Sequence, residues 1–205
     1  MFETIFILIV LYFSIVIHEI AHGSCALLLG DDTAKREGRL TLNPIAHIDP
    51  IGTIFLPLIL LILTFGQGPI FGWAKPVPVN PLNFRDKKWG IVKVSLAGPA
   101  TNLLIAILFS FLAGFNFPRA MINFFEIISI YNFSWAFFNL LPLPPLDGFH
   151  ILYQILPERF FSLKFFLLQY GFLILLFIIF FGLAPIFSFS QSLFNLISHR
   201  FFLGF

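Results

Sequence analysis

Residues 5–30 read IFILIVLYFSIVIHEIAHGSCALLLG, an almost wholly apolar run that is interrupted by His18, Glu19 and His22. An apolar run of this length predicts a transmembrane helix. Positions four apart lie on the same face of a helix, so His18 and His22 can point at one metal ion. Imidazole is a good zinc ligand, and Glu19 is placed to take a proton from water. Ionisable groups at membrane depth mark functional sites, so this stretch indicates a metal site inside a membrane rather than a polar stripe satisfied by a neighbouring helix.

The composition supports a membrane protein. Of the 205 residues, 59% are hydrophobic and 11% are charged, and the mean hydropathy is +0.95. A soluble domain would be about half apolar and about a quarter charged. The net charge of +2 gives no indication of nucleic-acid binding, and a single cysteine, Cys25, rules out an intrachain disulfide. We therefore expect an all-α integral membrane protein.

Four apolar segments are long enough to cross a bilayer: about 4–29, 91–115, 121–141 and 160–185. Two further segments are ambiguous. Residues 51–66 are short and contain Pro57, so they either span the membrane or re-enter it, and the tail at 188–205 is either interfacial or a final span. The sequence thus predicts about four to six transmembrane helices. The prolines in Phe71–Pro81 add an extended strip that would lie near the active site.

The positive charges predict an orientation. If residues 51–66 do not cross, ten of the twelve Lys and Arg residues share one side of the membrane, in the stretches 30–50, 67–93 and 157–164. Only Arg119 and Arg200 lie opposite. Basic loops favour the cytoplasm, so we expect the N-terminus outside and the basic loops inside.

A catalytic zinc usually has three protein ligands, so a third is needed. Asp147 is the best candidate, because it is a lone carboxylate in the proline-rich break LPLPPLDG at 141–148. Asp147 could instead cap the helix that follows it, and His150, one turn later, could be the ligand. His47, in a loop, and His199, near the end, are weaker candidates for a metal ligand.

Three motifs in order carry a resemblance to the site-2 proteases, the intramembrane zinc metalloproteases of peptidase family M50, and to their short prokaryotic members in particular. HEIAHG at 18–23 resembles the zinc-binding helix of that family, and GPATN at 98–102 resembles its second core helix. NLLP at 139–142, followed by LDG at 146–148, resembles the motif whose aspartate is the third ligand. The resemblance covers most of the chain and implies that Asp147 is a ligand.

The resemblance also implies a function. It predicts one Zn²⁺ per chain, bound by His18, His22 and Asp147, with Glu19 as general base. The mechanism also needs an oxyanion or substrate-positioning donor, for which Asn102 and Asn139 are candidates; each could equally brace a helix junction. The substrate would be a transmembrane or membrane-associated protein, cleaved within or near the bilayer of a prokaryotic cell membrane, often after an upstream site-1-type protease has trimmed it. We expect one multi-pass domain over 1–205, with core helices at about 4–29, 91–115 and 121–156 and no PDZ or CBS domain. The alternatives are an inactive homologue that binds membrane segments and a metal transporter.

Overall fold

The computed structural model describes residues 2–65 and 72–200, and every regular element within those ranges is a helix. The α-helices are α1 (Phe2–Leu28), α2 (Thr33–Arg36), α3 (Leu56–Leu63), α4 (Lys87–Ala113), α5 (Arg119–Asn139), α6 (Asp147–Ile155), α7 (Phe161–Phe181) and α8 (Leu183–Arg200). A π-helix at Pro50–Phe55 leads into α3, and short 3-10 turns lie at Pro44–His47, Pro81–Asn83 and Glu158–Phe160. The expected all-α fold is confirmed.

Three helical stretches in this part of the chain are long and apolar enough to cross a membrane: Ile5–Leu28, Lys87–Ala113 and Glu158–Phe181. Helix α5 has 21 residues and a comparable length, but polar side chains such as Glu126 and Asn132 lower its hydropathy. The chain is therefore a multi-pass membrane protein. Residues 66–71 and 201–205, where the ambiguous segments end, lie outside the described residues.

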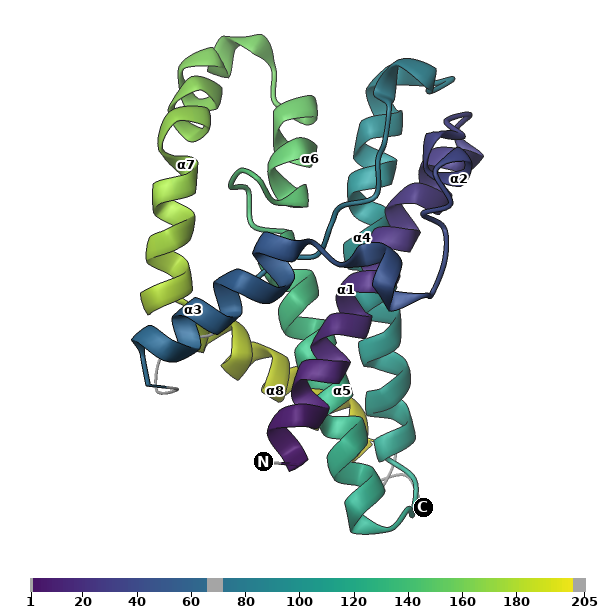
Figure 1. Cartoon of the computed structure of the whole chain (residues 1–205), viewed down its shortest axis with the longest axis vertical. Helices are drawn as coiled ribbons and strands as arrows, with labels where there is room; N and C mark the ends of the chain where they lie inside the picture. Colours follow the sequence, from purple (N-terminus) through teal and green to yellow (C-terminus); the bar gives the residue numbers. More distant parts are fainter. Residues whose placement is uncertain (1, 66–71, 201–205) are drawn as a thin grey trace.

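Helix α4 is at the centre of the fold and packs against α1, α5, α6 and α8 (Figure 1). Its buried face consists mainly of small residues spaced four apart, namely Gly90, Val94, Gly98, Asn102, Ala106 and Ser110. Small residues at this spacing let neighbouring helices approach closely. Ser110 Oγ, for example, lies 2.5 Å from Ser129 Oγ on α5, and Ser129 also donates to the carbonyl of Ala106.

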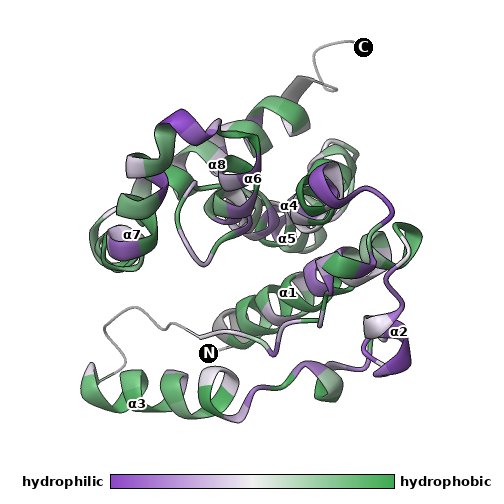
Figure 2. Ribbon diagram, turned by 90° about the horizontal axis from the view of Figure 1, so that it is seen from above, coloured by the Kyte–Doolittle hydropathy of each residue, from purple (hydrophilic) through white to green (hydrophobic). Residues whose placement is uncertain are grey.

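The segment from Pro50 to Leu63, which we call the α3 arm, is a short apolar helical stretch and not one of the candidate spans. Its 14 residues extend about 21 Å at ~1.5 Å per residue, less than the ~30 Å of a bilayer core. Viewed from above, α3 lies on one side of α1, and α4, α5 and α8 lie on the other (Figure 2). Figure 1 also shows α2, the start of α4 and the α6–α7 connection at the same end of the molecule, as the charge pattern predicts for a segment that does not cross.

Asp31 ties the loop after α1 to the segment before α4. Its carboxylate is fully buried and accepts hydrogen bonds from the Asn80 backbone at 2.7 Å, from the Asn83 side chain at 2.8 Å and from Thr33. Burial raises the pKa of Asp31, but these hydrogen bonds stabilise the charged form and bring the pKa below its ordinary value. Asp31 thereby holds the end of α1 against residues 80–83.

The C-terminal helix α8 packs against α5. Ser190 on α8 hydrogen-bonds Ser134 on α5 at 3.0 Å, and Gln191 donates to Glu126 at 3.0 Å. Phe194 is buried in the same contact. These polar pairs join α8 to α5, so α8 is packed against the helix bundle.

A labelling experiment tests the arrangement of the loops. In a Cys25→Ser background, single cysteines replacing Lys35 and Lys88 should react with a membrane-impermeant maleimide from the same side of the bilayer, because residues 50–63 do not cross. A cysteine replacing Arg119 should react from the opposite side. Labelling of positions 35 and 88 from opposite sides would contradict this topology.

Candidate metal centre

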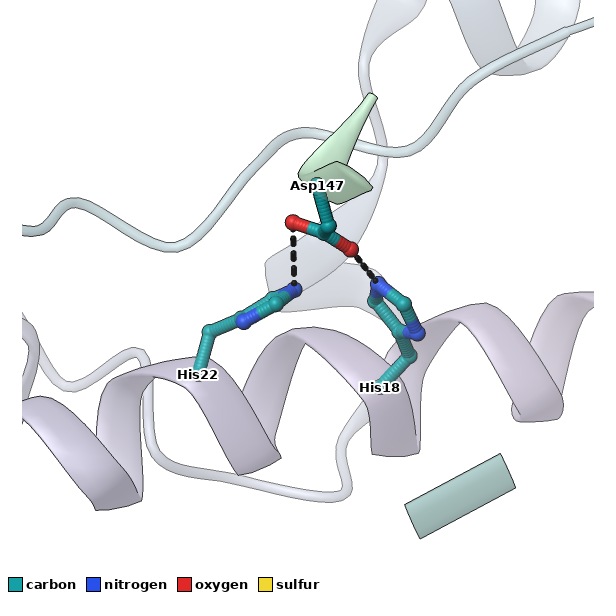
Figure 3. A group of neighbouring side chains, drawn as sticks. All are labelled: His18, His22 and Asp147. Atoms are coloured by element: carbon teal, nitrogen blue, oxygen red, sulfur yellow. Dashed lines mark hydrogen bonds and ion pairs between the residues drawn. The ribbon is translucent and has the colours of Figure 1, made fainter. Parts of the chain in front are cut away.

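Helix α1 places His18 and His22 on one buried face. The two rings lie edge to face with their centroids 4.6 Å apart, and the side chains are almost fully buried. The spacing of four residues, a little over one helical turn, accounts for this alignment. Both Nε2 atoms point away from α1 toward the start of α6 (Figure 3).

Asp147 completes a three-residue cluster with these histidines. It is the first residue of α6, directly after the irregular segment 140–146. One carboxylate oxygen lies 3.0 Å from His18 Nε2 and the other lies 3.3 Å from His22 Nε2 (Figure 3). Ligands bound to zinc at about 2.0–2.1 Å in a tetrahedron lie roughly 3.3 Å apart. One ligand atom from each residue lies within 4.8 Å of the others, so the cluster has the donor types and spacing to hold a zinc ion.

Hydrogen bonds from α4 fix the tautomer of both histidines. His22 Nδ1–H donates to the carbonyl oxygen of Val94 at 2.7 Å, and His18 Nδ1–H donates to Asn102 Oδ1 at 2.6 Å. Each Nε2 therefore keeps its lone pair for a metal, an arrangement typical of metal-binding histidines. Both donors on Asn102 Nδ2 are engaged, by the Ser14 carbonyl at 3.2 Å and by Asn132 Oδ1 at 2.8 Å.

Ser14 and Asn132 belong to this network, but the motifs do not contain them. Asn132 is 1% exposed and Asn102 is fully buried. The only sequence signal for Asn132 is its polarity in an apolar helix, a signal that several other α5 residues share. Asn102 has no free N–H for an oxyanion in this arrangement, so its position favours a role in orienting His18.

Glu19 lies beside the cluster but is not part of it. Its Oε2 accepts a hydrogen bond from the Val77 backbone N–H at 2.8 Å. Glu19, Val77 and the three cluster residues all line one cavity of about 410 Å³. A carboxylate held at the wall of such a cavity is suitably placed to exchange a proton with a water or substrate inside it.

The extended strip at 72–80 forms one wall of this cavity. It has no regular secondary structure, as the prolines predict, and other parts of the chain satisfy its backbone. The Arg39 guanidinium donates to the carbonyls of Lys75 and Pro76 at 2.8 and 3.3 Å, and Lys75 N–H donates to the His47 carbonyl at 2.9 Å. Within the strip, Pro76, Val77 and Val79 line the cavity.

The remaining predicted candidates lie in different places. Asn139 and His150 both line the cavity, although neither belongs to the metal-type cluster found among the described residues. Asn139 Nδ2 donates to the Trp135 carbonyl at 2.9 Å. His47 is fully buried and bonds the Thr41 carbonyl through Nε2, and the side chain of His199 lies outside the described residues.

Gly98 on α4 allows the histidine rings to reach their positions. A Cβ at residue 98 would lie 2.5 Å from His22 Nε2 and 2.6 Å from His18 Nε2. Real side chains essentially never approach so closely, and both rings are held in place by their hydrogen bonds to α4. The glycine in GPATN is therefore required by the close contact between α4 and both rings.

Comparisons with known proteins agree with this geometry. A sequence profile for "Peptidase family M50" matches residues 117–181. The chain is 44% identical over 162 residues to "Putative zinc metalloprotease YwhC" of Bacillus subtilis (strain 168). The aligned region covers 74% of the chain and 69% of the relative. The chain is 34% identical over 139 residues to "Putative zinc metalloprotease Rip2" of Mycolicibacterium smegmatis, covering 66% of the chain and 51% of the relative. No solved structure matches the chain.

The contact at Gly98 generates a prediction. Gly98→Ala should lower the metal content of the purified protein severalfold, because the added methyl group displaces both rings. Helix propensity alone would make α4 more stable by ~1 kcal/mol in the alanine variant. A loss of metal in this variant would therefore not come from a weaker helix. Metal per chain, measured by mass spectrometry, checks this, with Ala100→Val on the exposed face of α4 as the control. Normal metal content in Gly98→Ala would contradict the prediction.

Proposed function

The chain belongs to peptidase family M50, and from that premise we propose that it is an intramembrane zinc metalloprotease. The observation that carries the proposal is the convergence of His18, His22 and Asp147 at one buried point, with Glu19 at the wall of the same cavity. These are the positions that a metalloprotease motif on a helix requires for metal ligands and general base. A transporter would need ligands distributed along a path, whereas these ligands meet at one place.

We propose that His18, His22 and Asp147 hold one Zn²⁺ per chain. Two neutral imidazoles and one carboxylate form a donor set found at catalytic zinc sites, and the hydrogen bonds to Val94 and Asn102 leave both Nε2 atoms free to bind. When bound, zinc lowers the pKa of a water ligand and polarises the scissile carbonyl. Asp147 contributes a negative charge that favours binding of the cation.

Glu19 is the proposed general base. Its carboxylate takes a proton from the attacking water and later gives that proton to the leaving amine. The Val77 N–H holds Oε2 at 2.8 Å, and Glu19 lines the catalytic cavity. Asn139, which lines the cavity, is the better of the two proposed asparagine donors for the oxyanion, because Asn102 already uses both amide hydrogens.

The proposed substrate is a membrane-embedded or membrane-associated polypeptide. A scissile bond in a transmembrane helix is protected by the hydrogen bonds of that helix, so the helix must unwind locally before attack. Pairing with the strip at 74–79 would satisfy the released backbone groups. We propose a single catalytic domain in a prokaryotic cell membrane, with its basic loops in the cytoplasm, acting on substrates that an upstream protease has shortened.

Glu19→Gln tests the role of the base. The variant should keep its zinc, because Glu19 is not a ligand, and should lose cleavage of a reporter transmembrane segment by at least about a hundredfold. Zinc content and fragment formation by the purified protein are the measurements, and Glu158→Gln, at an exposed position, is the matched control. Undiminished cleavage by Glu19→Gln would exclude this mechanism. Zinc binding without any cleavage by the wild type would favour an inactive homologue.

Asp147→Ala, Asp147→Asn and His150→Ala identify the third ligand. Both Asp147 variants should lose activity and retain less zinc, because each removes the negative charge at the cluster. Asp147 does not cap α6, because the N-cap residue is Leu146 and no side chain makes a cap hydrogen bond. The Asn variant keeps nearly the size and shape of the side chain, so it isolates the loss of the negative charge. His150→Ala should retain its zinc. If Asp147→Asn behaved like the wild type and His150→Ala lost both zinc and activity, the third ligand would be His150.

A further inference from the structure

A second cavity, of about 470 Å³, lies beside α1 on the side of α3. Nearly all of its lining side chains are apolar, and it is distinct from the cavity that contains Glu19 and the metal-type cluster. Figure 2 shows α1 and α3 running side by side with the strip between them. We call this second cavity the α1–α3 groove.

On α1, the groove and the metal centre occupy one continuous face. The groove residues are Leu8, Leu11, Tyr12 and Ile15. Steps of three and four residues define a single stripe along a helix, and the same steps lead from Ile15 to His18, Glu19 and His22. A chain segment lying along this stripe of α1 therefore extends from the groove toward the catalytic cavity.

A matching stripe on the α3 arm (Pro50–Leu63) forms the opposite wall. Its groove residues are Ile54, Pro57, Leu58 and Leu61, which again follow steps of three and four. Between the walls, the strip continues from one cavity to the other: Gly72, Trp73 and Ala74 line the groove, and Pro76, Val77 and Val79 line the catalytic cavity. The two cavities thus share α1 as one wall and the strip as another.

The polar groups of the groove are already engaged. Tyr12 donates its hydroxyl hydrogen to the Pro44 carbonyl at 2.7 Å, and Thr53 donates to the Trp73 carbonyl at 2.8 Å. An occupant therefore finds apolar surface and few unengaged polar side chains. A polypeptide in such a place must satisfy its own backbone, which in a membrane means that it is helical.

We infer that the α1–α3 groove binds an apolar transmembrane helix of the substrate, immediately next to the scissile bond. Leu8 to Ile15 spans ~10 Å at 1.5 Å per residue, which corresponds to about two turns of a bound helix. The substrate is helical in the groove and becomes extended where it meets the strip at Pro76 and Val77. This inference rests on the proposed function and adds a specificity site to it: large apolar residues within about two turns of the cleavage point.

The continuity of the groove with the catalytic cavity is what favours a substrate helix over a lipid acyl chain. A lipid chain needs only apolar surface, which the outer faces of α3 and α7 supply in quantity. The groove instead ends at the strip, whose next residues, Pro76 and Val77, line the catalytic cavity, where a polypeptide, unlike a lipid, has a peptide bond to present.

Filling the groove tests the inference by kinetics. Leu58→Trp should raise KM for a reporter transmembrane substrate roughly tenfold and leave zinc content unchanged. Leu63→Trp makes the same change on the same helix, away from the groove, and should leave KM unaltered. A reporter whose large apolar residues within two turns of the cleavage point are replaced by alanine should be less sensitive to Leu58→Trp. Equal KM values for Leu58→Trp and Leu63→Trp would overturn the inference.

Photocrosslinking separates this inference from the proposed function. In the Glu19→Gln background, a benzophenone side chain at position 58 should capture the reporter helix, and one at position 63 should not. Capture of phospholipid alone at position 58 would overturn the inference in favour of a lipid site. Capture of the reporter by a protein whose wild type cleaves nothing would uphold the groove and refute the proteolytic activity.

Discussion

A histidine inside a membrane has two ring nitrogens, and each needs a partner because hydrocarbon offers none. His18 and His22 solve this in the same way: their Nδ1–H groups donate to α4, and their Nε2 atoms face Asp147. Helix α4 can supply those acceptors only if it approaches α1 closely, which Gly98 permits. The close packing of α1 and α4 and the arrangement of the site both follow from the need to give each ring nitrogen a partner.

The strip at 72–80 follows the same rule with irregular backbone. Non-helical chain at membrane depth is stable only where protein satisfies its polar groups. Arg39, the His47 carbonyl and Glu19 each do so for part of the strip, and Asp31 fixes its far end through Asn80. One of these partners, Glu19, is also the proposed base, so the strip and the catalytic carboxylate hold each other in place.

The sequence predicted the parts of the fold that depend on local spacing. The four-residue step from His18 to His22 and the break before Asp147 are local patterns, and the structure brings these residues together. Asn132 could not be singled out, because its importance comes from its contact with Asn102, 30 residues away along the chain. The contacts of α8 could not be predicted for a similar reason: its partners Ser134 and Glu126 lie on α5, and only the folded chain brings them to Ser190 and Gln191.

The separation of Asp147 from His18, 129 residues along the chain, has a consequence for biogenesis. Helix α1 carries both histidines, whereas the carboxylate that faces them is synthesised later, after α4 and α5. A growing chain therefore has no complete site until α6 has emerged and folded back onto α1. A chain that ended before α6 would therefore lack the carboxylate of the proposed metal site.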